Sequence, residues 1–542
     1  MRRERLLLTL LLAVFAGRIA LTYRVFNDTT DESFHISAGV EYLERGYYEL
    51  EAQHPPLGRL VVAALPYGLA ELRLGDAYTI WNGGAWQRRE LPYYWLTLTL
   101  ARMGNLVYAV ALLVVVWRWS GALAGPRASL LACLLLVCCP NVLAHSALAT
   151  LDIGAAASVL LGSYCLWRWS EQPGWGGALA AALAAAVAAL TKFSAVFFLV
   201  PIGLVYLAAA MRGAGRRKLV GGLARLAACG VAAAVVVWAA YGFEVGALAP
   251  PGHQYRSGFQ FEHPAQGAPR LLARLVENHT MPAPKLWQGM IDVLTHNEHG
   301  HLSYLLGELS PAGWWHYFLV AVGVKTTLPM LLLVLVALGL WAARGGRPRG
   351  LLYPVLALAV ILLVSMSGRL NIGIRHVLAV YPLFAIVAGA MLAQVRGGWL
   401  RAAGVLVVWH AAESVAAHPD YLAYFNQIAR GREERFLADS NLDWGQDLVR
   451  LAEYVERQGI PSVQLSYFGV TSPAKMHLPH TALDWHHPKA GWVAISVNHL
   501  VGIGTGDHAR FFRERPPDGR AGKSIFVYNL SSEEAARFAA SQ

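Results

Sequence analysis

The sequence predicts a mainly α, polytopic membrane protein with about 11 transmembrane helices, followed by a small C-terminal α/β domain. Three observations support this prediction: the composition, a series of long apolar windows, and a change of character near residue 417. Of the 542 residues, 56% are hydrophobic and only 15% are charged, and the mean hydropathy is +0.40. Soluble domains have about 45–50% apolar and about 25% charged residues, so an ordinary soluble protein is excluded.

Windows of about 20 apolar residues, the length that crosses a bilayer as a helix, recur before residue 417. They fall at 6–24, 96–117, 129–147, 153–170, 176–191, 193–211, 219–241, 315–342, 350–367, 376–395 and 400–416. The segment 57–74 is also apolar, but Pro66, Gly68 and two charged residues interrupt it, which predicts a helix lying along the membrane surface. The first window resembles a signal peptide, but no clear small-x-small cleavage site follows, so we expect it to remain as a span.

The distribution of Lys and Arg predicts the orientation of these spans, because basic residues favour the cytoplasmic side. With the N-terminus inside, the inner segments hold Arg2, Arg3, Arg5, Arg118, Arg127, Arg168, Arg212, Arg216, Arg217, Lys218, Arg225, Arg344, Arg347, Arg349, Arg396 and Arg401. A first loop (25–95), a second large loop (242–314) and the part from 417 are then expected outside. The net charge of +11 is explained by these inner segments and by attraction to anionic membrane lipids, and no nucleic-acid partner is expected.

Beyond residue 417 the apolar windows give way to short segments of changing periodicity. We interpret 436–441 as a strand, 442–459 as a helix, and 462–469, 492–498 and 524–529 as three further strands. The predicted domains are therefore a membrane catalytic domain, 1–416, and an α/β domain, 417–542. The five cysteines all fall inside predicted spans, where core packing is their expected role, so the outer parts are not disulfide scaffolds.

The first outer loop contains the strongest candidate for a catalytic group. Asp31 and Glu32 follow the first span directly, and an ionised carboxylate in hydrocarbon costs about 3 kcal/mol or more, so both are expected at the outer boundary. There Asp31 can act as general base on an acceptor hydroxyl, with Glu32 as second candidate. Alternatively, either carboxylate caps a helix that begins near Phe34. His54, near the end of the polar segment 34–60, is a candidate substrate contact.

Asp152 is a further acid, at the predicted outer boundary between the third and fourth spans. It is expected either to cap the fourth span or to orient the substrate. A third alternative joins it with Asp31 around a divalent cation, which prefers carboxylate oxygens.

Three cations depart from the positive-inside pattern. Lys192 lies in a short outer turn, and Arg369 and Arg375 flank another. Cations at this level suit a phosphate group, which Arg binds bidentately and Lys binds as a point charge. The alternative is that these side chains reach ordinary lipid headgroups.

Lys325 is expected inside a span, about ten residues and so roughly 15 Å below the interfacial pair Trp314-Trp315. At that depth it must face a partner or a water-filled cavity. The partner is either a lipid phosphate or a carboxylate, and a purely structural ion pair is an equal alternative.

Histidines of the second loop form no regular metal-binding spacing such as HExxH, so we expect surface or substrate contacts and assign no metal. These residues are His253, His263, His279, His296, His299 and His301. In the C-terminal part, Asp439, Asp443 and Asp447 surround Trp444, and we interpret them as caps of a strand-to-helix turn. No Walker loop, dinucleotide fingerprint or nucleophile elbow is found.

Several motifs, in this order, resemble the GT-C superfamily of membrane glycosyltransferases, and most closely the protein O-mannosyltransferase family (glycosyltransferase family 39) and its aminoarabinose-transferase relatives. These motifs are DE (31–32), HPPL (54–57), AHSALATLD (144–152), LTKFS (190–194), YLLGELSPAGWWHYF (304–318) and IGIRHVLAVYP (372–382). The C-terminal segments HPDYLAYFN (418–426) and DSNLDWGQDL (439–448) resemble bacterial phospholipid-carrier-dependent glycosyltransferases.

The resemblance implies a sugar donor linked to polyprenyl phosphate, transfer on the outer face of a bacterial inner membrane, and Asp31 as the base. The acceptor is a glycan, a lipid or a protein. No cofactor is required, and a divalent metal stays an open alternative. Gln53-His54 replaces the acid-Lys pair of the aminoarabinose branch, so a lipid A acceptor is not implied. A transporter or flippase for a lipid-linked anion explains the buried charges equally well, but not the long first loop or the outer C-terminal part.

Overall fold

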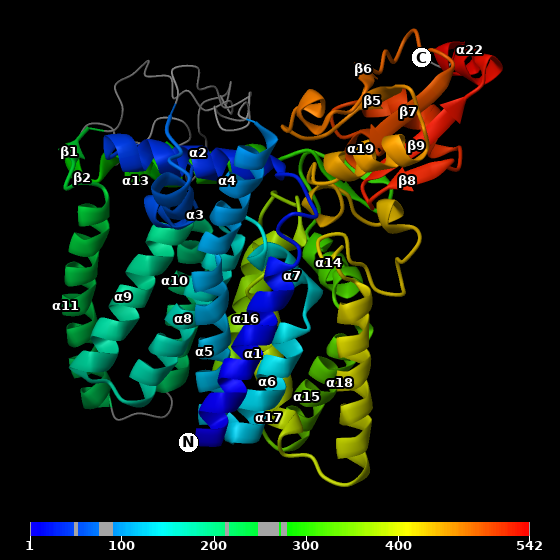
Figure 1. Cartoon of the computed structure of the whole chain (residues 1–542). Coiled ribbons are helices and arrows are strands. Elements are labelled where there is room, and N and C mark those ends of the chain that lie inside the picture. The colour runs from blue at the N-terminus through cyan, green and yellow to red at the C-terminus, as the bar shows by residue number, and fades with distance from the viewer. Residues whose placement is uncertain are drawn as a thin grey trace.

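The computed structural model describes residues 2–47, 53–74, 90–211, 216–247, 270–272 and 279–540, and it is mostly helical, as expected. Helices run side by side in a bundle with the N-terminus at one end (Figure 1). The helices of the first and second loops and the C-terminal sheet all lie at the opposite end. This arrangement gathers the predicted outer segments, although they are far apart in the sequence, at one end of the molecule.

The helices of the bundle follow the predicted windows closely. They are α1 (Arg2–Ala20), α4 (Leu91–Gly104), α5 (Leu106–Ala124), α6 (Pro126–Val137), α7 (Pro140–Ser146), α8 (Asp152–Glu171), α9 (Trp175–Thr191), α10 (Phe193–Met211), α11 (Arg216–Ala240), α14 (Tyr317–Lys325), α15 (Leu328–Ala343), α16 (Leu352–Met366), α17 (Val380–Leu392) and α18 (Gly398–Ala416). Short 3-10 turns precede α16 and α17, namely η3 (Arg349–Leu351) and η4 (Ile374–Val377).

Within the described residues, 4 helical stretches are long and apolar enough to cross a membrane, or up to 6 if each of two bent pairs counts as one span. Helices such as α9 and α17 are apolar but shorter. The count of eleven spans therefore stays a prediction.

Two predicted spans are not straight helices. The window 129–147 is divided into α6 and α7, which meet at 68°, and 315–342 is divided into α14 and α15, which meet at 114°. A proline explains each break, because it has no N–H to donate and fits only the first turn of a helix. Pro140 begins α7, and Pro329 is the second residue of α15, which Thr327 caps. Lys325 is the last residue of α14, so it lies at the bend and not in the middle of a straight span, and its depth stays a prediction.

The two large loops contain helices and short strands that cover the end of the bundle. They are α2 (Thr30–Arg45), α3 (Pro56–Leu69), β1 (Val245–Gly246), β2 (Met281–Pro282), α13 (Pro284–His299), β3 (Ser303–Leu305) and β4 (Glu308–Ser310). The helix expected over 57–74 is α3, and it ends earlier, at Leu69. It packs so closely on α2 that a Cβ on Gly39 would lie 2.4 Å from the Arg59 carbonyl oxygen, so only glycine fits there.

The C-terminal part contains a five-stranded mixed sheet with the order β6-β5-β7-β9-β8. Strand β5 is parallel to β6 and β7, whereas β9 is antiparallel to β7 and β8. The elements are η5 (Glu433–Arg435), η6 (Asp439–Asn441), α19 (Leu448–Arg457), β5 (Val463–Ser466), η7 (Pro473–Met476), β6 (His480–Ala482), β7 (Gly491–Ser496), α20 (Val497–Leu500), η8 (Gly506–Ala509), α21 (Arg510–Arg513), β8 (Gly519–Ala521), β9 (Ile525–Leu530) and α22 (Ser532–Ala540).

Three of the four expected strands are present as β5, β7 and β9, but the strand expected at 436–441 is wrong. Leu437 makes one isolated bridge, to Leu305, and the chain then enters the turn η6. Asp439 has a φ of 54°, in the left-handed region, which no strand contains. Polar side chains of this turn bond to other segments instead of a neighbouring strand.

The C-terminal part shares its hydrophobic core with the rest of the chain. Ile36 of α2 and Leu98 of α4 belong to the same buried cluster as Leu451 of α19 and Val463 of β5. Buried apolar contacts of this kind are the main source of folding stability. The C-terminal part is therefore packed onto the bundle and not merely tethered to it.

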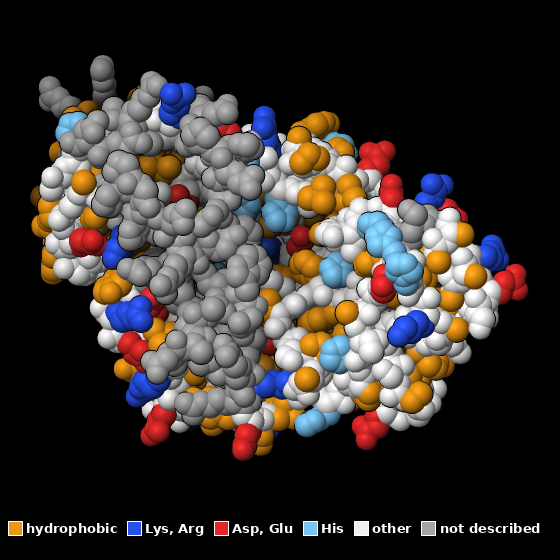
Figure 2. Space-filling model, turned by 90° about the horizontal axis from the view of Figure 1, so that it is seen from above, with side chains coloured by type: hydrophobic (Ala, Val, Ile, Leu, Met, Phe, Trp, Pro, Cys, Tyr) orange, Lys and Arg blue, Asp and Glu red, His pale blue; other side chains and the backbone are white. Residues whose placement is uncertain are grey.

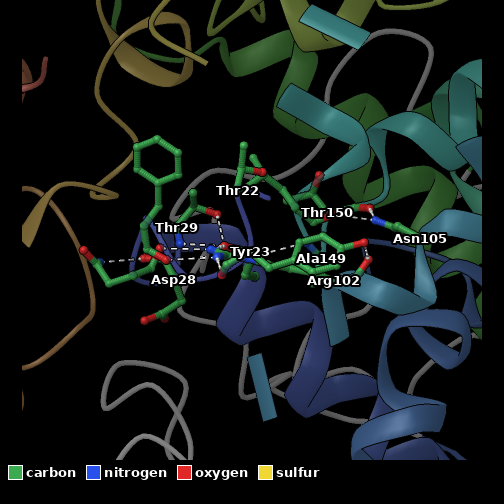
Figure 3. A network of polar contacts seen from close by, with 12 residues as sticks. Thr22, Tyr23, Asp28, Thr29, Arg102, Asn105, Ala149 and Thr150 are labelled. Carbon is green, nitrogen blue, oxygen red and sulfur yellow. Dashed lines mark hydrogen bonds and ion pairs between the residues drawn. The ribbon is translucent and has the colours of Figure 1, made fainter. Parts of the chain in front are cut away.

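A buried ion pair fixes the start of α2. The Arg102 guanidinium donates Nε to Glu32 Oε1 and Nη2 to Glu32 Oε2, both at 2.8 Å, and the two side chains are 1% and 0% exposed. Arg102 also donates to the carbonyls of Tyr23, Phe26 and Asn27. Glu32 further accepts from the backbone N–H of Thr29 and of Ala149 (Figure 3). The pair thus holds the first loop against α4 and the segment before α8.

We predict that Arg102→Gln destabilises the protein by about 3–5 kcal/mol, because it leaves the Glu32 carboxylate buried without its cation. Thermal or denaturant unfolding of the purified protein in detergent measures this loss. Arg24→Gln is the matched control, since Arg24 is exposed and makes one long hydrogen bond, at 3.5 Å to Thr99. Equal stability of the two variants would contradict the structural role of the pair.

We also predict that reporter fusions placed after residue 241 and at the C-terminus both report the outside of the membrane. The basic inner turns and the position of these segments opposite the N-terminus lead to this expectation. A C-terminal reporter active in the cytoplasm would contradict the topology and change the number of spans.

Candidate functional site

A cavity of about 250 Å³ lies where the two loops, the α9–α10 turn, the segment of η4 and the C-terminal part meet. Its walls are formed by Thr30, Asp31, Phe34, His35, Gln53, His54, Lys192, Phe193, Ser194, Val293, His296, His301, Leu370, Ile372, Arg375, His376, Asp439, Trp444 and Phe468. Seen from this end of the molecule, histidine, acidic and basic side chains appear together beside the C-terminal part (Figure 2). Four predicted site residues are thus brought together: Asp31, His54, Lys192 and Arg375.

Asp31 and Arg375 form an ion pair in this cavity. Arg375 Nη1 donates to Asp31 Oδ2 at 2.5 Å, and the two side chains are 9% and 28% exposed. The guanidinium also lies 4.3 Å from the centre of the Trp444 ring, a cation–π contact that fixes its plane. Arg375 Nε is buried and finds no hydrogen-bond acceptor among the described residues. One donor of the guanidinium is therefore unused.

The local sequence explains how these two side chains are positioned. Thr29 caps α2, so Asp31 lies in the first turn, where a carboxylate is favoured by the helix dipole. Arg375 lies in η4, the turn that begins directly after Gly373. Gly373 has a φ of 151°, and a Cβ there would lie 2.1 Å from Ser440 Oγ, so glycine is required.

Lys192 lies in the turn between α9 and α10, as predicted, and pairs with Asp152, the first residue of α8. Lys192 Nζ donates to Asp152 Oδ1 at 2.7 Å, and the side chains are 11% and 1% exposed. A small adjoining cavity connects this pair with Arg375 and His376. Asp152 is therefore placed behind Lys192, next to the main cavity and not in its wall.

Histidines form much of the remaining wall. Burial, reinforced by Lys192, lowers the pKa of His54 to about 3. Burial and the neighbouring His301 lower the pKa of His296 to about 4. Both rings are consequently neutral near pH 7 and offer hydrogen bonds without charge. The cations that face the cavity are then the guanidinium of Arg375 and the amine of Lys192.

Glu32, Lys325 and Arg369, which were predicted as site residues, do not line the cavity. Glu32 is fully buried, and both carboxylate oxygens accept hydrogen bonds from protein groups, so the geometry gives it a positioning role. Lys325 donates from Nζ to the carbonyls of Leu422 and Asn441, both at 2.6 Å, and fastens the C-terminal part to α14. The Arg369 side chain is exposed and donates to the Glu298 carbonyl, which holds the end of α13.

Two wall residues, Asp439 and Trp444, come from the C-terminal segment that was interpreted as helix caps. The motif DSNLDWGQDL contained the signal, because buried tryptophan and aspartate in one short turn are unusual outside a site. His35, Gln53 and His376 were also not singled out. Their position becomes evident only when the loops are folded together.

No metal site is found in the part of the chain that the structure describes, in the sense of three or more His, Cys, Asp or Glu side chains grouped around one point. The sequence also allowed a divalent cation bound between Asp31 and Asp152. The ion pairs argue against it, because Asp31 is paired with Arg375 and Asp152 is paired with Lys192. His253 and His263 lie outside the described residues.

Comparison with known proteins shows what this chain resembles. Residues 6–245 match the sequence model of the dolichyl-phosphate-mannose-protein mannosyltransferase family (PMT). The expected resemblance to GT-C membrane glycosyltransferases is thus confirmed. Asp31, His54, Asp152 and Lys192 lie inside the matched PMT segment, whereas Arg375 lies beyond it.

Solved structures show the same fold over nearly the whole chain. ArnT from Cupriavidus metallidurans, bound to undecaprenyl phosphate, is 14% identical, with a TM-score of 0.51 over 96% of this chain and 97% of that chain. The oligosaccharyltransferase AglB from Archaeoglobus fulgidus, in complex with an inhibitory peptide and a dolichol-phosphate, is 11% identical, with a TM-score of 0.51 over 97% of this chain and 74% of that chain. No curated protein sequence matches the chain. At this identity the likeness concerns the fold.

Proposed function

We propose that this protein is an inverting glycosyltransferase that moves a sugar from a polyprenyl-phosphate carrier to an acceptor hydroxyl. A single observation carries the proposal: one cavity joins the carboxylate of Asp31 to two cations, Arg375 and Lys192. The match to the PMT model supports glycosyl transfer, and two proteins of the same fold were solved with polyprenyl phosphates. Because a fold alone does not determine a function, the argument rests on the residues of the cavity.

The donor phosphate is the natural ligand of the two cations. Arg375 has one unused donor at Nε, and Lys192 reaches the same cavity from the α9–α10 turn. Arginine binds phosphate bidentately and lysine adds a point charge. Arg375 pairs with Asp31, so an incoming phosphate competes with Asp31 for the guanidinium.

This competition couples donor binding to activation of the base. Once phosphate takes the guanidinium, the Asp31 carboxylate is released from its ion pair and becomes available to the acceptor hydroxyl. Asp31 then removes the proton from the acceptor hydroxyl, and the hydroxyl oxygen forms a bond to the anomeric carbon. The bond from that carbon to the phosphate oxygen breaks with inversion. The polyprenyl phosphate leaves, with its charge stabilised by Arg375 and Lys192.

We place the reaction at the outer face of a bacterial inner membrane. The predicted inner turns are rich in Arg, and the cavity lies at the opposite end of the bundle. The division into a membrane domain, 1–416, and a C-terminal domain, 417–542, belongs to the same proposal. A transporter or flippase of lipid-linked anions remains the competing function, and it predicts movement of the lipid without formation of a glycosylated product.

We predict that Arg375→Ala weakens binding of undecaprenyl phosphate about 10- to 100-fold, the value of one lost hydrogen bond to a charged group. Lys192→Ala is expected to act in the same direction. Binding is measured on detergent-purified protein whose folded state is verified by thermal unfolding.

Arg369→Ala is the matched control, because it removes the same group from an exposed position outside the cavity. If both cavity variants bind the lipid as tightly as the control does, the phosphate assignment is wrong.

We predict that Asp31→Asn lowers turnover by roughly 10²–10⁴-fold, the usual contribution of a general base. Asparagine keeps the shape of the side chain but does not accept the proton, so binding of the donor lipid should persist. Transfer of radiolabelled sugar from undecaprenyl-phosphate-linked donors in membranes measures the rate. Near-normal turnover would exclude Asp31 as the base.

Glu32→Gln separates catalysis from positioning at the neighbouring residue. Because Glu32 is buried against Arg102, this variant should lose stability, whereas its folded fraction should retain more turnover than Asp31→Asn.

A further inference from the structure

The C-terminal part contributes a second carboxylate to the cavity. Asp439 lies in the turn η6, is 8% exposed, and lines the cavity together with Asp31 and Arg375. Asp439 forms no ion pair with a described residue, although Arg375 and His301 lie close enough to act on its charge. The general-base mechanism uses Asp31 and leaves this second carboxylate without a role.

Hydrogen bonds hold the turn rigidly against the bundle. Asn441 Oδ1 accepts from the backbone N–H of Ile374 at 2.9 Å, one residue before Arg375. Ser440 Oγ donates to the Ile372 carbonyl, and Asn498 Oδ1 accepts from the Asp439 N–H at 2.7 Å. Asp439 is therefore fixed relative to the cations of the cavity and does not depend on a flexible tether.

The two oxygens of the Asp439 carboxylate differ in their hydrogen bonding. Oδ1 accepts from the backbone N–H of Ser440, whereas Oδ2 makes no hydrogen bond to any residue that the structure describes. Burial raises the pKa of Asp439, and Arg375 is the main group opposing this shift. A carboxylate oxygen without a protein donor, in the wall of a cavity, can accept a hydrogen bond from a ligand.

The backbone at Asp439 adopts an uncommon conformation. Its φ of 54° is in the left-handed region, which glycine, asparagine and aspartate adopt more readily than other residues do. Conformations of this kind persist where surrounding bonds impose them and are concentrated at ligand sites. Here the imposed conformation directs the side chain to the wall shared with Arg375.

We propose that Asp439 accepts hydrogen bonds from hydroxyl groups of the sugar on the donor, so that the C-terminal part determines which sugar is used. This inference rests on the proposed function. A sugar joined to a phosphate at Arg375 places its ring hydroxyls beside that cation, on the wall that Asp439 occupies. A carboxylate only accepts hydrogen bonds and sugar hydroxyls donate them, and such charged bonds are short and strong.

Trp444 has a different role in the same wall. Its side chain is 2% exposed and its ring packs under the guanidinium of Arg375, so little of the ring is available to stack on a sugar. Trp444 is a positioning residue for the phosphate site, whereas Asp439 presents an acceptor to the cavity.

The test compares two kinds of probe on the full-length protein in detergent: bare undecaprenyl phosphate, and a panel of undecaprenyl-phosphate-linked hexoses and pentoses. Wild type should bind at least one sugar-bearing lipid more tightly than the bare lipid. Asp439→Asn, which tolerates the left-handed backbone, should bind the bare lipid as wild type does. It should bind the preferred sugar-bearing lipid about tenfold more weakly, as expected for one lost charged hydrogen bond.

Asp484→Asn is the matched control, because this aspartate of the C-terminal part is 56% exposed and remote from the cavity wall. An equal loss for both kinds of lipid in Asp439→Asn would mean that the residue acts on the phosphate site, and would overturn the proposal. Unchanged binding of both, or a wild type that prefers no sugar, would overturn it as well. Failure of wild type to bind even bare undecaprenyl phosphate would instead refute the proposed function, and this inference with it.

Discussion

The buried pair between Glu32 and Arg102 is the interaction on which the site depends. Two charges removed from water are stable only when every donor and acceptor is used, and here the guanidinium bonds to three carbonyls as well as to the carboxylate. The pair fixes the first turn of α2. The residue before Glu32, Asp31, is thereby held facing the cavity. One carboxylate of an adjacent pair is thus the support, and the other is available for chemistry.

The walls of the cavity are formed jointly by the loops, the bundle and the C-terminal part. The loop residue Asn27 donates to the Gly445 carbonyl and accepts from the Leu448 N–H, which joins the first loop to the segment before α19. Lys325 fastens the same segment to α14 from the other side. With these contacts, the wall that carries Asp439 and Trp444 has the rigidity of the core. Precise placement of this kind is what transition-state stabilisation requires.

The sequence predicted those site residues that violate a general rule. Lys192 and Arg375 were expected as cations at an outer boundary, and Asp31 as an acid at the end of a span, so each was recognisable without a structure. Lys325 was expected inside one straight span because hydropathy does not detect a bend of 114° between two apolar helices. Asp439 was missed because its site partners lie far away along the chain. The sequence alone did not distinguish the roles of Asp31 and Glu32. Which of the two carboxylates is buried depends on the residue at which helix α2 begins.

The order in which the wall is completed has a consequence for biosynthesis. Asp31 and Lys192 are synthesised before Asp439, Trp444 and Phe468, because they precede them in the chain. Until that last segment has docked, the cavity lacks one side, and Arg375 lacks the aromatic ring beneath it. A chain in which this segment has not docked therefore lacks the wall that encloses Asp31, Lys192 and Arg375, and the cavity exists only after the whole C-terminal part has folded onto the bundle.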